Sequence, residues 1–431
     1  FVAEDGTRGS ELWRTDGTPG GTVIVSDLYG GSLGSTPRPL DGMSGELYFF
    51  ASDLAGTAGL WHTQGTQTPT LVSRAYTSNN GSNPDYLTQV GSHWFYRAHI
   101  DSTGGELWVT DGTLGGSRLV KDIAPGSISS NPNNFVALGN ILYFSASDNT
   151  NGTELWRSDG TEAGTYLVSD IQSGVMGSNP AQLTAFNGQL YFSADDGVVG
   201  TELWKSGGTA ATTVLVKDLY TGNFGGFPIN FTAFKGELYF GATDTVLGPT
   251  LWKTNGSTAG TQLFMDISPA TNYLGTPDNF LIFGDALFFS AENDAQGKEL
   301  WKTDGTAPGT VLFKDLEPGG SGSYPYGFKA LGNKFMFVAY ESATGYEPWI
   351  SDGTPAGTYV VKDIYAGGSS SSLNQYVALG DQLYFSADDG INGSELWKTD
   401  GTVTGTVMVK DIRAGMGSMI QGMTALNQKL Y

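Results

Sequence analysis

Short apolar runs separated by polar turns make up the hydrophobic pattern of this chain. In one stretch, apolar and β-branched residues dominate 183–186 and 190–194, and the pair Asn187-Gly188 lies between them. Runs of this kind, bounded by Gly, Asn, Asp or Pro, are typical of β-strands, and Asn-Gly is a preferred two-residue hairpin turn. Helical periodicity is not sustained anywhere over a useful length. The pattern therefore predicts an all-β chain with many tight turns.

The pattern repeats along the whole chain. A Leu-Trp or Pro-Trp pair recurs with a mean spacing of 48 residues, and only Trp94 lies outside this series. Each unit contains four predicted strands, for example 154–156, 165–168, 183–186 and 190–194. Nine units fill residues 1–431 as a single repeat domain. The recurring tryptophans, which we expect to be structural core residues between units, are Trp13, Trp61, Trp108, Trp156, Trp204, Trp252, Trp301, Trp349 and Trp397.

Four antiparallel strands in each unit predict the blades of a β-propeller, whose known repeats have a similar period. Residues 429–431 followed by residues 1–5 reproduce the run of a second strand, so the end of the chain meets its start in phase. This predicts one closed ring of nine blades. An open or longer repeat array is the alternative, and because the sequence starts and stops within a strand, we expect a segment of a longer polypeptide.

Two recurring charged positions are predicted to pair across a hairpin. In five units a Glu and a Lys lie fifteen residues apart, as do Glu395 and Lys410, and folding the turn at 400–405 places them on facing strands. The Asp that opens this turn is expected to accept backbone N–H bonds in an Asx-type turn, and the Gly after it to have a left-handed backbone.

Composition excludes several classes of function. The chain has 22 Lys and Arg residues against 43 Asp and Glu residues, a net charge of −21, and no cysteine. Disulfides and thiolate chemistry are therefore excluded, and an acidic surface repels nucleic acid and anionic lipid. No apolar stretch is long enough to span a membrane, so we expect neither nucleic acid nor membrane insertion.

The motif Glu-Leu-Trp-x-x-Asp-Gly-Thr occurs at 11–18, 106–113, 299–306 and 395–402. It resembles the ELWxxDGT-repeat family of secreted bacterial β-propeller-like proteins, and the resemblance covers the whole chain. The resemblance implies an extracellular or cell-surface bacterial protein, often part of a larger multi-domain chain. The family offers no enzymatic residue that transfers to a position here, so no catalytic residue is assigned.

Acidic loops after the second strand are the candidate metal sites. Clustered carboxylates suit calcium, which takes six to eight oxygen ligands, although no loop has the spacing of a dedicated calcium-binding loop. No other cofactor is expected. The candidate ligands are Asp5, Asp195, Asp196, Asp388 and Asp389.

Aromatic residues in the variable stretches are the candidate ligand-binding residues. Aromatic faces beside Asn, Ser and Gly suit sugar rings or a protein partner, and sealing of the seam between blades is the alternative role. The second unit is the most divergent and carries His62, His93 and His99, which indicates relaxed constraint or a dedicated site. The candidates are Trp94, Tyr96, Tyr220, Phe224, Tyr273, Tyr324 and Tyr326.

These features favour a non-enzymatic extracellular module that serves as an adhesion, binding or structural scaffold for carbohydrate or protein partners. One alternative is a polysaccharide lyase or hydrolase built on a propeller. Another is a building unit of an extracellular filament or surface layer. An enzyme would concentrate special residues from several blades at one place, whereas a scaffold would keep its nine sites equivalent.

Overall fold

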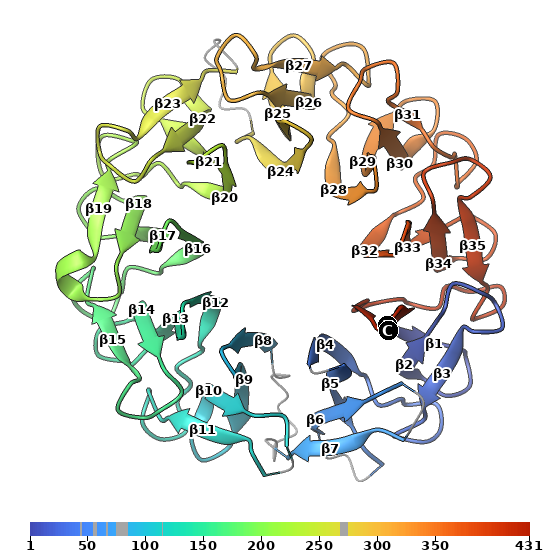
Figure 1. Ribbon diagram of the computed structural model, residues 1–431, viewed down its shortest axis with the longest axis horizontal. Coiled ribbons are helices and arrows are strands. Elements are labelled where there is room, and N and C mark those ends of the chain that lie inside the picture. The colour runs from blue at the N-terminus through green and yellow to red at the C-terminus, as the bar shows by residue number, and fades with distance from the viewer. Residues whose placement is uncertain (44, 55–57, 66–67, 75–84, 114, 268–274) are drawn as a thin grey trace.

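The chain forms a ring of nine blades around an open centre (Figure 1). The computed structural model describes residues 1–431 except 44, 55–57, 66–67, 75–84, 114 and 268–274. The described residues contain one short 3-10 turn, Ala210–Thr212, and no helix long and apolar enough to cross a membrane. Blade 1 combines both ends of the chain, and blades 2 to 9 follow in sequence order.

The first strand of each blade lines the centre of the ring, and the second lies behind it (Figure 1). The first strands of blades 1 to 9 are β36 (Ala425–Leu426), β4 (Arg38–Met43), β8 (Asp85–Val90), β12 (Asn133–Leu138), β16 (Ala181–Phe186), β20 (Ile229–Phe234), β24 (Asp278–Phe283), β28 (Tyr326–Leu331) and β32 (Asn374–Leu379). The second strands are β37 (Lys429–Leu430) with β1 (Val2–Glu4), β5 (Glu46–Ser52), β9 (His93–Ile100), β13 (Ile141–Ser147), β17 (Gln189–Asp195), β21 (Glu237–Asp244), β25 (Ala286–Asn293), β29 (Lys334–Glu341) and β33 (Gln382–Asp388).

The third strand carries the Leu-Trp or Pro-Trp pair, and the fourth lies on the outside of the ring (Figure 1). The third strands are β2 (Ser10–Arg14), β6 (Ala58–Thr63), β10 (Gly104–Thr110), β14 (Thr153–Ser158), β18 (Thr201–Ser206), β22 (Gly248–Thr254), β26 (Gly297–Thr303), β30 (Gly345–Ser351) and β34 (Ser394–Thr399). The fourth strands are β3 (Val23–Ser26), β7 (Thr70–Ser73), β11 (Arg118–Lys121), β15 (Tyr166–Ser169), β19 (Val214–Lys217), β23 (Gln262–Met265), β27 (Val311–Lys314), β31 (Tyr359–Val360) and β35 (Val407–Lys410).

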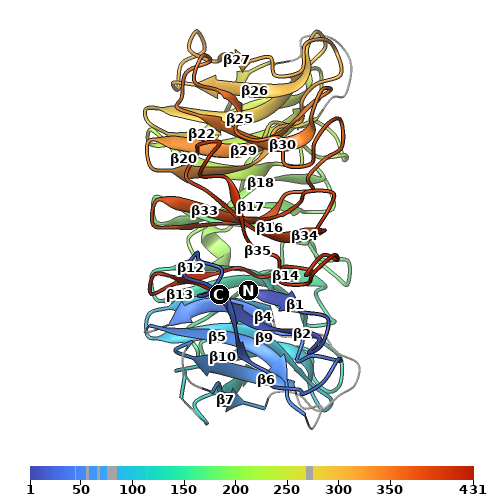
Figure 2. The same cartoon turned by 90° about the vertical axis from the view of Figure 1, so that its right-hand side faces the viewer.

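The two ends of the chain close the ring within blade 1. Figure 2 shows the two termini next to each other. The N–H of Val2 donates to the carbonyl of Gln421 at 2.9 Å, and Thr15 and Leu430 exchange two backbone bonds of 2.9 and 3.0 Å. The second strand of blade 1 is therefore built from both ends, as the sequence predicted. The nine-bladed closed ring is confirmed, and the open array is not observed.

The tryptophans fill the spaces between neighbouring blades. Trp397 of blade 9 packs against Met336 and Ile350 of blade 8, and eight of the nine recurring tryptophans are buried. Trp108 is half-buried and lies at the edge of the cluster between blades 2 and 3. The second strands bury both faces, so their apolar residues are continuous rather than alternating. The structural role predicted for the tryptophans is confirmed.

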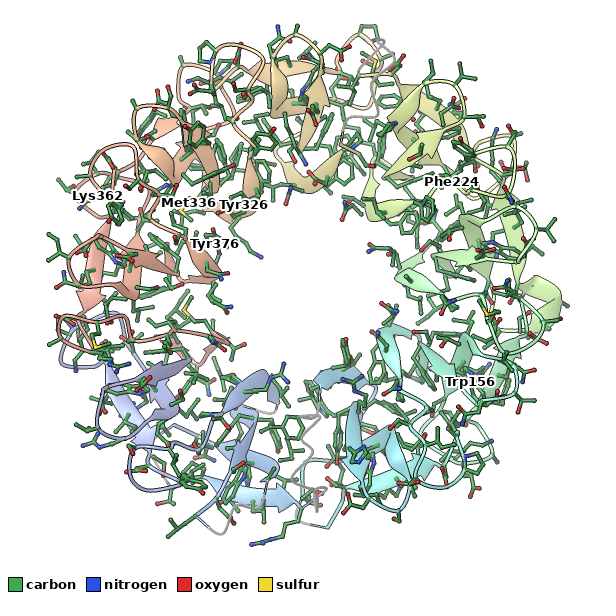
Figure 3. All side chains as sticks on the ribbon, turned by 180° about the vertical axis from the view of Figure 1, so that it is seen from behind. Trp156, Phe224, Tyr326, Met336, Lys362 and Tyr376 are labelled. Carbon is green, nitrogen blue, oxygen red and sulfur yellow. The ribbon has the colours of Figure 1, made fainter. Side chains whose placement is uncertain are left out.

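The recurring lysine binds the next blade and not the glutamate of its own blade. Lys362 Nζ donates to the carbonyl of Thr406 at 2.8 Å and lies 5.5 Å from the ring centre of Trp397, on the outer side of the ring (Figure 3). Lys410 makes the same two contacts with Thr22 and Trp13 across the closure of the ring. The predicted glutamate–lysine pairs are therefore wrong.

A β-bulge explains why that prediction fails. The register shifts between Leu396 and Trp397, so that Lys410 faces Leu396 and not Glu395. The turn itself forms as predicted, because Asp400 Oδ1 accepts the Thr402 N–H at 2.9 Å and Gly401 has φ of 80°. One extra residue in the bulge is enough to move the glutamate away from the lysine.

The recurring glutamate is fully buried and binds the crossover to the next blade. In blade 7, Glu299 accepts the N–H of Leu316 at 2.9 Å, the N–H of Ser323 at 2.8 Å and the Ser323 hydroxyl at 2.7 Å. Burial of a carboxylate is costly unless such donors surround it. In every one of the seven blades with this residue, the carboxylate accepts hydrogen bonds from the crossover, although the set of donors differs: Gly226 offers Glu202 only its N–H, and Ser418 offers Glu395 only its hydroxyl. The seven residues are Glu11, Glu106, Glu154, Glu202, Glu299, Glu347 and Glu395.

We predict that Glu154→Ala destabilises the ring. The change leaves the N–H groups of Ile171, Gln172 and Ser178 without their acceptor. Each buried donor that is left without a hydrogen bond costs about 1–3 kcal/mol of stability. Urea unfolding should show a loss of at least about 3 kcal/mol in the free energy of unfolding. Glu162→Ala, which removes an exposed glutamate, is the matched control and should change it by less than about 0.5 kcal/mol. Equal losses in the two variants would contradict the role of Glu154.

The buried glutamates also predict how stability depends on pH. Burial raises the pKa of Glu106, Glu202, Glu347 and Glu395 from 4.5 to about 7. Between these values the folded ring keeps protons that the unfolded chain releases, so the free energy of unfolding falls as the pH rises from 4.5 to 7. The urea midpoint should be higher at pH 5 than at pH 8.

Repulsion within the acidic surface acts in the same direction, so a variant separates the two effects. Glu347→Gln removes one titrating group and should make the stability less dependent on pH, whereas Glu162→Gln removes an exposed charge and should leave the dependence almost unchanged. A Glu347→Gln protein with the wild-type pH dependence would refute the assignment.

Candidate functional site

The first strands present one free edge to the centre of the ring (Figure 1). In each described first strand of blades 2 to 9, the register with the second strand shifts near its start, as between Ala181 and Thr184 in β16. The second residue of the strand lies in this bulge and has a left-handed backbone in blades 3 to 9. These residues are Tyr86, Asn134, Gln182, Asn230, Asn279, Gly327 and Gln375, with φ between 55° and 69°.

Five of these bulge residues carry a side-chain amide, and several of the amides bridge neighbouring blades. The Gln182 Oε1 atom accepts the N–H of Asn230 at 3.3 Å. Gln375 Oε1 accepts the N–H of Gly422 at 3.0 Å, and Asn134 Nδ2 donates to the carbonyl of Pro180 at 3.1 Å. The amides therefore form part of the seam between blades on the channel side.

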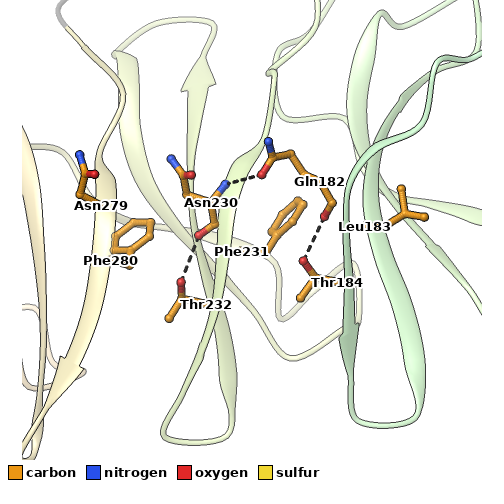
Figure 4. A pocket seen from close by; sticks show the side chains of 8 residues that line it. All are labelled: Gln182, Leu183, Thr184, Asn230, Phe231, Thr232, Asn279 and Phe280. Carbon is orange, nitrogen blue, oxygen red and sulfur yellow. Dashed lines mark hydrogen bonds between the residues drawn. The ribbon is translucent and has the colours of Figure 1, made fainter. Parts of the chain in front are cut away.

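A pocket of about 380 Å³ opens on the channel wall across blades 5, 6 and 7 (Figure 4). Its lining is Gln182, Leu183, Thr184, Asn230, Phe231, Thr232, Asn279 and Phe280. None of these side chains is charged. The side-chain amide of Asn230 and the Nε2 atom of Gln182 have no hydrogen-bond partner in the described part of the chain. The pocket thus combines free amides with hydroxyls and two phenyl rings.

The two phenyl rings are held in place by the core behind them. The ring centres of Phe231 and Phe240 are 5.4 Å apart, and those of Phe280 and Phe289 are 5.7 Å apart. Phe240 and Phe289 are fully buried, whereas Phe231 and Phe280 are half-buried. Each half-buried ring therefore has one face fixed against its blade and keeps a part open to the pocket.

The channel wall differs from blade to blade. A second pocket of about 350 Å³, lined by Arg38, Pro39, Leu40 and Tyr86, lies on blades 2 and 3. There the Arg97 guanidinium is 5.4 Å from the Tyr86 ring centre. The uncharged amide pocket is thus a local feature of one arc of the ring and not a ninefold repeat.

Two predicted ligand-binding residues are buried instead. Trp94 and Tyr96 are 4% and 0% exposed and pack with Tyr48 and Phe50 between blades 2 and 3. Burial raises the pKa of Tyr96 to about 12. Their predicted binding role is therefore wrong, because the extra aromatics of this divergent unit complete the core.

The other predicted aromatics that the structure describes lie on different crossovers and strands, and of these only Tyr220 and Phe224 contact each other. Tyr220 and Phe224 have ring centres 5.4 Å apart on the crossover after β19, where Phe224 is 64% exposed. Tyr324 is exposed, and Tyr326 is half-buried against Tyr346 on the inner side of the ring (Figure 3). Tyr273 lies outside the described residues.

The acidic loops fold as self-contained turns. Asp196 Oδ1 accepts the N–H groups of Val198 and Val199 at 2.8 and 2.9 Å. The predicted calcium ligands Asp5, Asp195, Asp388 and Asp389 make similar bonds in their own loops. Among the described residues, no group of three or more His, Asp or Glu side chains could hold a metal ion. Calcium binding stays a prediction without a pre-formed site to support it.

The histidines do not form a catalytic arrangement. His62 pairs with Glu46 and stacks on Tyr48, and the equivalent positions in blade 6 hold the ion pair of Lys253 with Glu237. This indicates a structural role for the His62 pair. Ser92 Oγ is 3.5 Å from His93 Nδ1, longer than the roughly 2.6–3.2 Å at which a base activates a nucleophile. No catalytic residue is assigned.

The amide residues of the channel were not among the residues predicted from the sequence. Their signal was present, since Asn134, Gln182 and Asn230 recur at intervals of 48 residues. They lie at the start of the first strand, in a stretch where Asn also serves turns and bulges. Sequence alone did not indicate that this edge faces the channel.

Comparison with known proteins gives a distant structural likeness only. No family model and no curated protein matches the sequence. A prolyl endopeptidase structure is 12% identical with a TM-score of 0.45, covering 75% of this chain and 49% of that one. A puromycin-hydrolysing peptidase from Mycobacterium tuberculosis is 11% identical with a TM-score of 0.42, covering 82% and 57%. This chain spans about half the length of these solved chains.

These solved structures are described as peptidases or hydrolases. The sequence led us to expect a non-enzymatic adhesion, binding or structural module, which differs from what these structures are described as, and that module is not pursued further. A puromycin hydrolase with 13% identity and a TM-score of 0.37 belongs to the same group. At such identities only the fold is compared, and no active-site residue transfers to this chain.

We predict that the buried Trp94 contributes far more to stability than the exposed Phe224. Trp94→Ala removes a large side chain from the core between two blades and should lower the free energy of unfolding by about 3–5 kcal/mol. Phe224→Ala removes an exposed ring and should change it by less than about 1 kcal/mol. Urea unfolding of the two variants measures both. A larger effect from Phe224→Ala than from Trp94→Ala would reverse the assignment.

Proposed function

We propose that this chain is the propeller of a hydrolase and that a polymeric substrate lies against the amide pocket of its channel. The observation that carries the proposal is the uncharged pocket at Gln182, Asn230 and Asn279 on three neighbouring blades. Its volume falls in the usual range for ligand sites, and its free amides offer both donors and acceptors.

The inequality of the blades supports an enzyme over a repetitive scaffold. The bulge position holds an amide in blades 4 to 7 and in blade 9, but Pro39 in blade 2, Tyr86 in blade 3 and Gly327 in blade 8. A site that differs around the ring gives a polymer one preferred place to bind. The pocket side chains are amides, hydroxyls and apolar groups, none of them a strong acid, base or nucleophile. We therefore assign the pocket to substrate positioning and place bond cleavage in another part of the enzyme.

The cellular location belongs to the same proposal. The resemblance to the ELWxxDGT repeats implies an extracellular or cell-surface bacterial protein, and this stays a prediction. The net charge of −21 agrees with a substrate that is neither nucleic acid nor an anionic membrane. Carbohydrate and protein remain the two classes of substrate to compare.

Hydrolysis by the full natural protein tests the proposal. It should cleave either a polysaccharide, seen as new reducing ends, or an unfolded protein, seen as new amino groups. Thr232→Arg places a long charged side chain in the pocket and should lower kcat/KM at least tenfold, because it occupies the space of the substrate. Its urea midpoint should remain that of the wild type.

The control is Glu162→Arg, which adds the same side chain on an exposed turn and should keep the wild-type kcat/KM. Failure of the full protein to cleave any polymer of either class would refute the hydrolase. Full activity of Thr232→Arg would refute the role of the pocket.

A further inference from the structure

We propose that the channel pocket binds a neutral glycan chain; this rests on the proposed function, because it names the substrate of the same site. The pocket offers Asn230 and Gln182 amides, Thr184 and Thr232 hydroxyls, and the open parts of two phenyl rings. Sugar hydroxyls both donate and accept hydrogen bonds, as amides do, and the C–H faces of sugars pack on aromatic rings.

The backbone of the channel wall disfavours an extended peptide. A peptide normally joins the free edge of a sheet as an added strand and needs a continuous row of backbone groups. Here the register of β20 shifts between Ile229 and Thr232, and Asn230 has φ of 61°. The Asn230 N–H already donates to Gln182 Oε1. The edge is thus interrupted at the pocket, so a ligand there would be bound by side chains and not by a row of backbone groups.

The charges around the pocket favour a neutral glycan over an acidic one. No lysine or arginine lines the pocket. The nearest charged neighbour in sequence is Asp278, whose carboxylate is paired with Lys298 at 2.8 Å and accepts from Asn279 Nδ2 at 2.9 Å. A uronate or sulfate would enter an acidic protein without a cation to pair with.

The repetition of the wall matches the repetition of a polymer. Blade 5 presents Gln182 and Thr184, and blade 6 presents Asn230 and Thr232 at the same strand positions. In both blades the threonine hydroxyl donates to the carbonyl of the amide residue two positions earlier, at 3.0 and 3.3 Å, as Figure 4 shows. Two similar sets side by side suit two successive sugar units.

The structure indicates how to remove the amide without disturbing the backbone. The equivalent positions in blades 8 and 1 are Gly327 and Gly422, with φ of 69° and 59°. Asn230→Gly therefore deletes the side chain and keeps the left-handed backbone. Asn187→Gly is the matched control, because Asn187 is also left-handed, with φ of 47°, in the exposed hairpin turn after β16.

Calorimetric titration of the full chain tests the inference. The probes are cellohexaose, xylohexaose and mannohexaose as neutral glycans, hexagalacturonate as the acidic glycan, and a blocked, uncharged peptide of similar length. At least one neutral glycan should bind, and at least tenfold more tightly than hexagalacturonate and the peptide. Asn230→Gly should weaken that binding about tenfold, the loss expected for one or two hydrogen bonds, and Asn187→Gly should leave it unchanged.

Three results would overturn the inference: no binding of any neutral glycan, tighter binding of the peptide or of hexagalacturonate, or equal glycan binding by wild type and Asn230→Gly. The cleavage assay tests the hydrolase proposal separately from the glycan-binding proposal. Binding of a neutral glycan without cleavage of any polymer would refute the hydrolase proposal and support the glycan site. Cleavage of unfolded protein alone would support the hydrolase proposal and refute the glycan as its substrate.

Discussion

The buried glutamate of the third strand is the interaction on which the ring depends. In seven blades a carboxylate is removed from water and surrounded by donors from the crossover that leads to the next blade, as Glu347 is by Ile364 and Ser371. A buried charge without such donors would be unstable, so the crossover is held in one path. That path sets where the next first strand begins, and repetition of the same geometry produces the ring.

The outer contacts then join each blade to the next. The lysine of the fourth strand reaches the tryptophan and a backbone carbonyl of the following blade, as Lys314 reaches Trp349 and Thr358. Close packing adds to this contact at the turn after the third strand, which is Asn255-Gly256 in blade 6. A Cβ atom at Gly256 would lie 2.1 Å from the hydroxyl of Tyr191 in the preceding blade. Glycine at this position serves the left-handed backbone and the packing between blades at once.

With the outer part of each blade so constrained, variation is left to the channel side. The first strand has a neighbour on one side only, and its bulge directs the second residue toward the next blade and the channel. Amides at this position serve two purposes, since Gln182 bonds the neighbouring backbone through Oε1 and keeps Nε2 free. A site can therefore develop on one arc of the ring while the glutamates, lysines and tryptophans continue to hold the fold.

The sequence by itself determined the strands, the number of blades, the turns and the closure of the ring. These follow from local rules, such as the apolar runs, the left-handed glycine after Asp400, and the phase between Lys429–Tyr431 and the start of the chain. Only the tertiary structure decided what Glu395 and Lys410 bind, because a one-residue bulge changes the facing pairs beyond it and because their partners lie in a crossover or in another blade. The candidate site could not be predicted for the same reason. Whether Gln182 and Asn230 face water, a neighbouring blade or a ligand depends on which sheet edge lies at the centre of the ring. The spacing of residues along one strand does not contain that information.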